Sequence, residues 1–204
     1  MMVSIAIIVF VPHSVVQIFL LFVLWAITFP KLQVYEVVVF VITCIFFTLA
    51  DITVITKGVF QFTQTDIWNM PYYEPFVWGF YFLHAVRMLG VKEVHKIIPG
   101  LVFALAFTLP ISLVQDEVVT LTLSGLVLLV GLSVFRTKND FVYTLYFVLL
   151  GCIIEFVGTQ TGTWYYGIEH YYAWWVITWG GSGLILYRTL IPVSMYCARL
   201  LKKF

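Results

Sequence analysis

Charged side chains are scarce in this chain. Only 10% of its 204 residues are Asp, Glu, Lys or Arg, whereas 62% are hydrophobic and the mean hydropathy is +1.03. Soluble domains carry about 25% charged residues, so this chain has too little charge to cover a surface that faces water. Its net charge of +1 also lacks the basic excess that nucleic-acid binding requires. We therefore expect the lipid bilayer as its main partner and no nucleic acid.

Cysteines and known catalytic motifs are sparse as well. The three cysteines, Cys44, Cys152 and Cys197, lie in apolar runs or near the C-terminus and suggest no disulfide framework. The sequence contains no H-E-x-x-H, Walker or G-x-S-x-G pattern, and its histidines show no metal-ligand spacing. We expect neither a metal ion nor another cofactor.

Long apolar runs make up most of the sequence. A membrane-spanning helix needs roughly 20 mostly apolar residues, and loop-forming residues separate seven segments of approximately that length. The segments are 4–28, 34–54, 71–90, 97–115, 117–135, 141–158 and 172–198. The first has no basic flank and no cleavage site, so we interpret it as a membrane helix and not as a signal peptide. The sequence predicts an all-α, polytopic membrane bundle of about seven transmembrane helices, in a single domain over 1–204.

Basic residues fall mainly on one side of this predicted bundle. Lys57 is alone on one side, and the other side holds Lys31, Arg87, Lys92, Lys96, Arg136, Lys138, Arg199, Lys202 and Lys203. Loops rich in Lys and Arg remain in the cytoplasm. We therefore expect a multi-pass membrane protein with a cytoplasmic C-terminus and an outside or lumenal N-terminus.

An internal repeat relates the two halves of the chain. An acid is followed by a glycine after seven residues and by aromatics after nine and eleven, and the same order recurs 104 residues later. The members are Asp51, Gly58, Phe60 and Phe62 in the first copy and Glu155, Gly162, Trp164 and Tyr166 in the second. The same offset superposes three predicted helices on three others. It predicts two parallel three-helix units, about 4–90 and 117–198, joined by a linker helix over 97–115.

Three acids are the candidate catalytic residues. Asp51 and Glu155 are predicted near the outer ends of their helices, and Glu74 opens the next helix on the same side. Placing an ionisable group inside a membrane costs about 2.5–3.5 kcal/mol on insertion scales. A neutral carboxylic acid can protonate an alkene or an epoxide, and an ionised one can take a proton back. The structural alternative is that Asp51 satisfies loop backbone groups and that Glu74 complements a helix dipole.

Aromatic residues crowd the helices and loops beside these acids. An interfacial belt of Trp and Tyr at the membrane surface is one explanation. Rings that face inward can also bind a prenyl chain or stabilise a carbocation. The candidates for substrate binding are Phe60, Phe62, Trp78, Tyr81, Trp164, Tyr166, Trp175 and Trp179.

The order of acid, glycine and aromatic-x-aromatic, followed by Pro71, Glu74 and Phe76, resembles the lycopene cyclase domain of carotenoid biosynthesis. The sequence departs from that family where Tyr73 replaces the first acid of a Glu-Glu pair. Trp175 and Thr178 likewise stand where proline and glutamate align in the second unit. Carotenoid hydratases and membrane terpene cyclases are similar in size and in their acid and aromatic residues. The resemblance implies cofactor-free chemistry on an isoprenoid, started by a proton.

Functions of three classes follow from these observations. The first is an integral membrane enzyme that transfers protons from carboxylic acids to an isoprenoid or terpenoid, as a cyclase, hydratase or isomerase. Glu74 is then the candidate acid, and Asp51 and Glu155 are its partner acid or base. The second is a small transporter or lipid- or ligand-binding membrane protein without catalysis, since parallel repeats also occur in transporters. The third is an assembly subunit in which the acids satisfy only backbone groups.

Overall fold

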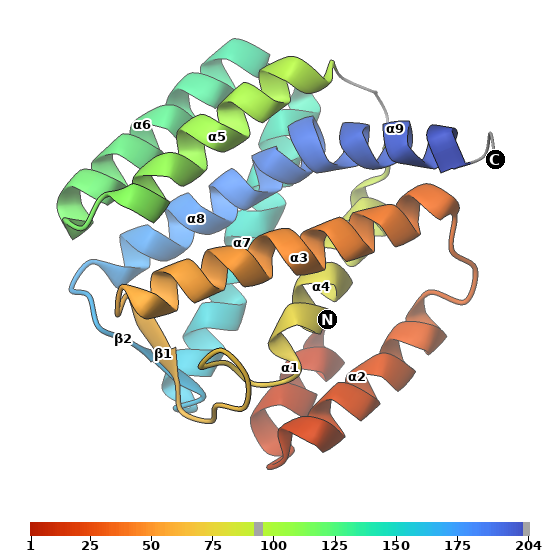
Figure 1. The fold of residues 1–204 in the computed structure, drawn as a ribbon, viewed down its shortest axis with the longest axis vertical. Helices are drawn as coiled ribbons and strands as arrows, with labels where there is room; N and C mark the ends of the chain where they lie inside the picture. The colour runs from red at the N-terminus through yellow and green to blue at the C-terminus, as the bar shows by residue number, and fades with distance from the viewer. Residues whose placement is uncertain (92–95, 202–204) are drawn as a thin grey trace.

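The computed structural model describes residues 1–91 and 96–201 as an all-α helical bundle with one short pair of strands (Figure 1). Lys92, Lys202 and Lys203, three of the basic residues that predict the orientation, lie outside the described residues. In chain order the elements are α1 (Met2–Phe10), α2 (Ser14–Thr28), α3 (Val34–Thr56), β1 (Phe60–Phe62), α4 (Glu74–Leu89), α5 (Ile97–Leu113), α6 (Glu117–Phe135), α7 (Lys138–Gln160), β2 (Trp164–Tyr166), α8 (Tyr171–Ile185), a π-helical turn η1 (Leu186–Leu190) and α9 (Ile191–Leu201).

The first predicted span, 4–28, is wrong as a single helix. The chain leaves the helix at Val11, whose φ of −93° and ψ of 121° are extended, and a second helix begins at Ser14. Pro12 explains the break, because proline disfavours the α conformation in the residue before it and has no N–H for the helical ladder. The predicted long helix is therefore a pair of shorter helices, α1 and α2, which pack against each other.

The predicted number of seven membrane-spanning helices is not confirmed. Four helices of the described residues are long and apolar enough to cross a membrane: α3, α6, α7 and the continuous helix from Tyr171 to Leu201. The apolar helices α2 and α5 have 15 and 17 residues, and α4 has 16. At 1.5 Å per residue these three are at most about 26 Å long, shorter than the roughly 30 Å hydrocarbon core.

The outer surface of the bundle is apolar. Phe19, Leu129 and Leu145 are 63%, 63% and 59% exposed, and many other large hydrophobic side chains of the long helices are exposed as well. Soluble monomers rarely expose contiguous apolar surface on this scale. Together with the four long apolar helices, this surface identifies a membrane-associated, lipid-embedded protein.

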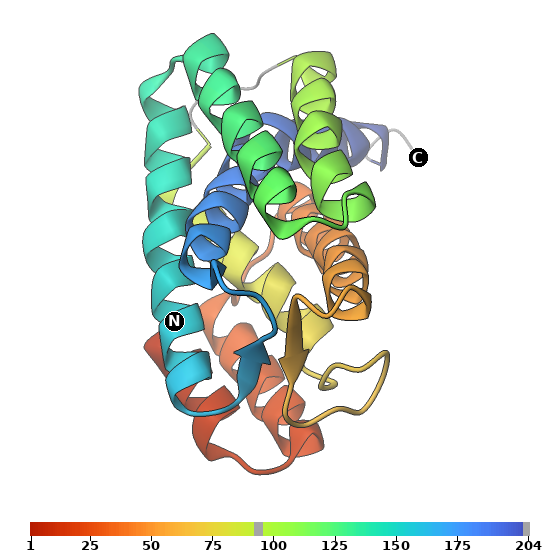
Figure 2. The same cartoon turned by 90° about the vertical axis from the view of Figure 1, so that its left-hand side faces the viewer.

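The two halves of the chain meet in the antiparallel pair of β1 and β2 (Figure 2). Phe60 pairs with Tyr166, Gln61 with Tyr165, and Phe62 with Trp164. The central pair joins two residues that are 104 positions apart, so the register places a local twofold axis between the strands. Both α3 and α7 lead into this strand pair, so the C-terminal ends of these equivalent helices lie at the same end of the bundle.

The repeated glycines end these two helices. Gly58 and Gly162 have positive φ angles of 74° and 69°, a conformation that glycine adopts without steric strain. The next residue in each copy returns its N–H to a carbonyl five residues earlier, from Val59 to Val54 and from Thr163 to Gly158. This is the hydrogen bond of a Schellman motif. The glycine recurs because each unit needs the same turn from helix to strand.

The repeat extends to the opposite end of the bundle. Gln33 and Glu36 form a capping box at the start of α3, and Thr137 and Asp140 form one at the start of α7. These positions again differ by 104 residues. The Arg87 guanidinium donates to Glu36, with one N–O distance of 2.7 Å, and the Arg188 guanidinium donates to both carboxyl oxygens of Asp140. Each unit is thus closed at this end by a capped helix and an ion pair.

Candidate functional site

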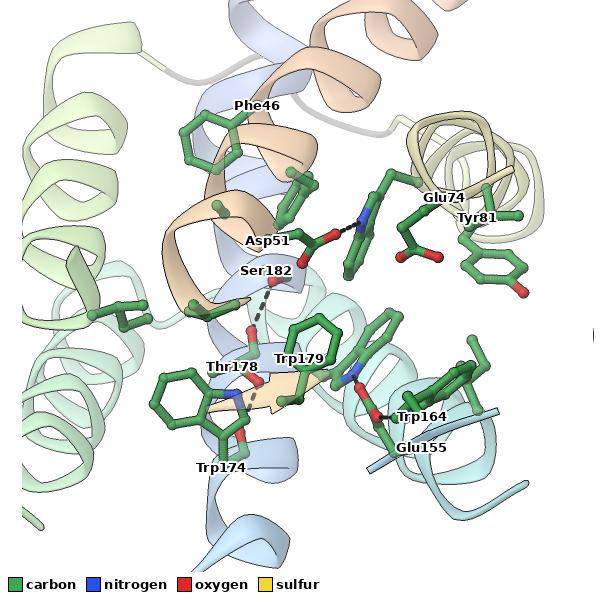
Figure 3. A pocket seen from close by; sticks show the side chains of 18 of the residues that line it. Phe46, Asp51, Glu74, Tyr81, Glu155, Trp164, Trp174, Thr178, Trp179 and Ser182 are labelled. Atoms are coloured by element: carbon green, nitrogen blue, oxygen red, sulfur yellow. Dashed lines mark hydrogen bonds between the residues drawn. The ribbon is translucent and has the colours of Figure 1, made fainter. Parts of the chain in front are cut away.

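A partly open pocket of about 120 Å³ lies inside the bundle near the strand pair. Its walls come from α1, α3, β1, α4, α5, α7, β2 and the helix that follows β2. Asp51, Glu74 and Glu155 all line it, from α3, α4 and α7 (Figure 3). We call this cavity the acid pocket. The three candidate catalytic carboxyl groups therefore share one site, although they are distant in sequence.

Glu155 is held by two tryptophans. The Trp164 indole N–H donates to Oε2 at 2.9 Å, and the Trp179 indole N–H donates to Oε1 at 3.0 Å. Both oxygens are therefore engaged by donors from different elements, β2 and α8. Tyr166 approaches the same carboxyl group with its hydroxyl. These contacts fix the carboxyl plane and satisfy an ionised form of Glu155.

Asp51 is held in a similar way, by the indole N–H of Trp78 on α4. The Trp78 and Trp179 rings lie against each other, with their centroids 5.1 Å apart. Two indoles in contact therefore separate the repeat-related acids, and each indole donates to one of them. Figure 3 shows Trp179 beside Glu155 at the centre of the site.

Glu74 has a different environment. It is 9% exposed and lines the same pocket as Asp51 and Glu155. Two buried carboxyl groups in one cavity repel each other when both are ionised, so a proton on one of them is favoured. Asp51 and Glu74 therefore form a pair suited to holding one proton, whereas Glu155 has indole donors.

At two repeat-related positions, the second half of the chain has small hydroxyl side chains where the first half has a carboxyl group and an indole. Thr178 and Ser182 of α8 line the acid pocket and stand 104 residues after Glu74 and Trp78. Their hydroxyls donate to carbonyls one turn earlier, Thr178 to Trp174 and Ser182 to Thr178, both at 2.7 Å. The two halves of the pocket are thus equivalent in backbone position and different in chemistry.

Two glycines of α7 bring the indoles to Glu155. A Cβ atom at Gly151 would lie 2.0 Å from the Trp179 ring, and one at Gly158 would lie 2.0 Å from the Trp164 ring. Gly151 is four residues before Glu155 and Gly158 is three after it, so all three lie on one helix face. Only the absence of side chains there allows both rings to pack flat beside the carboxyl group.

Six of the eight aromatic residues predicted to bind substrate line the acid pocket. They are Phe60, Phe62, Trp78, Tyr81, Trp164 and Trp179. Tyr166 and Trp175 instead pack together behind its wall, with ring centroids 5.9 Å apart. Tyr166 pairs with Phe60 at the other end of the strand register, and substrate binding by Tyr166 and Trp175 stays a prediction.

The pocket also contains residues that the sequence analysis did not select. Phe46 and Phe47 on α3, Phe107 on α5 and Trp174 on α8 complete its aromatic wall. Trp174 precedes Thr178 by four residues and Thr178 precedes Ser182 by four, which is the spacing of one helix face. That spacing could have predicted which face of α8 lines the pocket. No pattern in the sequence of α5 predicts its contact with the pocket, which arises from tertiary packing.

None of the residues lining the acid pocket is Lys, Arg or His. Arg87 and Arg188 are engaged with Glu36 and Asp140 at the other end of the bundle. Lys57 donates to the carbonyls of Ile111 and Val114 at 2.6 and 2.8 Å, at the C-terminal end of α5. Within residues 1–91 and 96–201, the three carboxyl groups therefore share their pocket with no basic side chain.

Of the described histidines, His13, His84 and His170, none lines the acid pocket. His84 and Tyr146 share a hydrogen bond of 2.9 Å between α4 and α7, and His84 and Arg188 thus have separate partners. No group of three His, Cys, Asp or Glu side chains suited to a metal ion occurs in 1–91 and 96–201.

Comparison with known proteins returns no match for this chain: no family model matches it, and neither does a curated protein or a solved structure.

Proposed function

We propose that the chain is an integral membrane enzyme that transfers protons between carboxyl groups and an isoprenoid or terpenoid substrate. The observation that carries this proposal is the single aromatic pocket shared by Asp51, Glu74 and Glu155. Acid–base chemistry needs a proton donor and an acceptor within reach of the same bound molecule. The reaction class is that of a cyclase, hydratase or isomerase, and it requires no metal or nucleotide.

The environments of the three acids suggest their roles. Asp51 and Glu74 are buried acids of one cavity, so this pair is the proposed proton source, with Glu74 as the donor because it has no indole partner like that of Asp51. Glu155 accepts two indole hydrogen bonds, which favour its ionised form, and is the proposed base. The rings of Trp78 and Trp179 lie between Asp51 and Glu155, and the other aromatic rings of the pocket wall would stabilise a transient carbocation.

The size of the pocket limits how much of a substrate it takes. A cavity of about 120 Å³ is comparable with engineered apolar cavities of about 150 Å³ that hold one benzene ring. The pocket therefore suits one ring or one prenyl unit of a terpenoid, with the rest of the molecule extending through its open side. The proposed chemistry acts at one end of the substrate.

The proposed orientation places the acid pocket toward the outer or lumenal side and the C-terminus in the cytoplasm, because Lys and Arg favour the opposite end. Single cysteines introduced at Lys138 and Gln61, after the native cysteines are replaced, test it with a membrane-impermeant thiol reagent. Labelling of only the Gln61 site in intact cells supports the orientation. Labelling of only the Lys138 site contradicts it.

The test of the enzyme is turnover by the chain in lipid nanodiscs supplied with linear and monocyclic terpenoids. Removing a proton-transfer group costs about 10²–10⁴-fold in rate, so Glu74→Gln and Glu155→Gln should each lose at least about 100-fold. Both variants should stay folded and retain binding. Glu169→Gln, an exposed acid of the loop after β2, is the matched control and should keep full activity. Turnover at the wild-type rate in both pocket variants would refute the proposal.

A second candidate is a small transporter or lipid-binding protein with the same pocket, which the parallel arrangement of the repeats favours. Liposome uptake separates the two functions. Accumulation of an unchanged terpenoid inside liposomes supports transport, whereas a changed product without accumulation supports the enzyme.

A further inference from the structure

We infer that the acid pocket is a binding site for a hydrophobic organic cation, such as a lipophilic quaternary ammonium group. The inference rests on the proposed function only in taking this pocket as the ligand site. It names a ligand class that the proton-transfer proposal alone does not require.

The first argument is the balance of charge. Three carboxyl groups line one cavity, and no Lys, Arg or His side chain lines it with them. Buried charges in proteins are normally paired, because an unpaired one loses several kcal/mol of hydration. Protons or a bound cation must therefore supply the positive charge at this site.

The second argument is that the polar groups of the pocket are already oriented. The indole N–H groups of Trp78, Trp164 and Trp179 donate to Asp51 and Glu155. The hydroxyls of Thr178 and Ser182 donate to carbonyls of their own helix. Their oxygen lone pairs remain for the ligand. Such a lining offers acceptors and negative charge, and the hydroxyls of Tyr73 and Tyr81 are its buried donors without a hydrogen-bond partner among the described residues.

The third argument is the aromatic wall. Phe47 and Trp179 flank the Trp78 ring, with ring centroids 4.8 and 5.1 Å away, so a cation would meet the faces of other lining rings, such as Trp174. Tryptophan faces are the best side-chain partners of a quaternary ammonium group. Glu74 is 9% exposed and lines the pocket beside two other acids, Asp51 and Glu155. It is the carboxyl group most in need of a positive partner.

The test compares two molecules of the same shape and different charge. Benzyltrimethylammonium carries a permanent positive charge, and neopentylbenzene replaces its nitrogen with carbon. Binding to the chain in nanodiscs is followed by tryptophan fluorescence, since Trp78, Trp164, Trp174 and Trp179 line the pocket. We expect saturable binding of the ammonium at least about tenfold tighter than that of the neutral molecule.

Variants connect that preference to the carboxyl groups. Asp51→Asn and Glu155→Gln should each weaken ammonium binding by at least about tenfold and leave neopentylbenzene binding unchanged. Glu169→Gln, on the exposed loop, should change neither. Circular dichroism on heating verifies that each variant is folded. Equal binding of the charged and neutral molecules, or undiminished ammonium binding in both pocket variants, would overturn the inference.

The same experiment separates this inference from the proposed function. Ammonium binding without turnover of any terpenoid supports the ligand class and counts against the catalytic proposal. Turnover that the ammonium does not inhibit, together with an absence of ammonium binding, supports the enzyme and contradicts the inference.

Discussion

The two ends of the bundle carry repeat-related acids with opposite partners. At one end, Glu36 and Asp140 bind arginine side chains. At the other, 15 positions further along in each copy, Asp51 and Glu155 bind indole N–H groups. The first arrangement neutralises charge within the fold. At the pocket end no cation from the described part of the fold neutralises the acids, so protons or a ligand must balance their charge. We therefore assign the chemistry to the pocket end and a stabilising role to the ion-pair end.

The strongest challenge to this comparison is removal of one arginine. Arg188→Met leaves Asp140 buried without its cation, because Asp140 is fully buried and Arg188 is 8% exposed. Breaking one partner of a buried ion pair costs about 3–5 kcal/mol. We expect a loss of that size in the free energy of unfolding, measured by denaturant titration in mixed micelles.

The double variant Asp140→Leu/Arg188→Met should recover most of that loss, since replacing a buried pair with apolar residues is often neutral. Arg199→Met, an exposed residue in the last turn of α9, is the matched control and should change stability by less than about 0.5 kcal/mol. An Arg188→Met variant as stable as the wild type would mean that this ion pair does not stabilise the fold.

A smaller effect is expected from packing at the pocket end. Gly158→Ala places a methyl group where the Trp164 ring now lies, so the ring must move and its bond to Glu155 is lost. Overpacking of this kind costs about 1–3 kcal/mol. We expect that decrease in the free energy of unfolding, together with a changed near-ultraviolet circular dichroism of the tryptophans.

Gly125→Ala in α6 provides the control for this substitution. Its added Cβ would lie 3.4 Å from Ile177, close to ordinary contact, and alanine is the better helix former by about 1 kcal/mol. This variant should be as stable as the wild type or slightly more so. A Gly158→Ala variant with unchanged tryptophan dichroism would show that Trp164 is not held against α7.

The smallest effect concerns Lys57, whose ammonium group donates to two carbonyls at the end of α5. A cation at a helix C-terminus stabilises by about 0.3–1 kcal/mol, so Lys57→Met should destabilise the chain by that amount. Lys96→Met at the opposite end of the same helix should have no effect or a slightly stabilising one. If the two substitutions have equal effects on the unfolding midpoint, Lys57 does not act through α5.

The sequence was sufficient to predict the helical class and the shared position of three acids, because hydropathy and a fixed offset are both one-dimensional signals. It did not reveal the strand pair, although aromatic residues at Phe60 and Phe62 already follow the two-residue period of a strand. The capping boxes of Gln33–Glu36 and Thr137–Asp140 also recur at the offset of 104 residues, so the sequence could have predicted them as part of the repeat, but we did not include them.

Other features depend on contacts that no local pattern encodes. Trp175 and Trp179 lie in the same aromatic run, yet only Trp179 reaches Glu155, because the direction of a ring depends on what packs behind it. The break at Pro12 shows the opposite case, in which a local residue decides the structure and hydropathy misses it. One local residue divides an apolar run that hydropathy alone presents as continuous.

The strand pair also governs the order in which the molecule can assemble. Phe60–Phe62 obtains its hydrogen-bonding partner only when Trp164–Tyr166 has been synthesised, about a hundred residues later. Until then the first half of the chain has an open strand edge and an acid with no neighbour from the second half. Closing that long interval is entropically unfavourable, so we expect the pocket to form late, in one step with the docking of the two halves. A ribosome that stalls in between would leave the first half of the chain with its helices formed and the acid pocket absent.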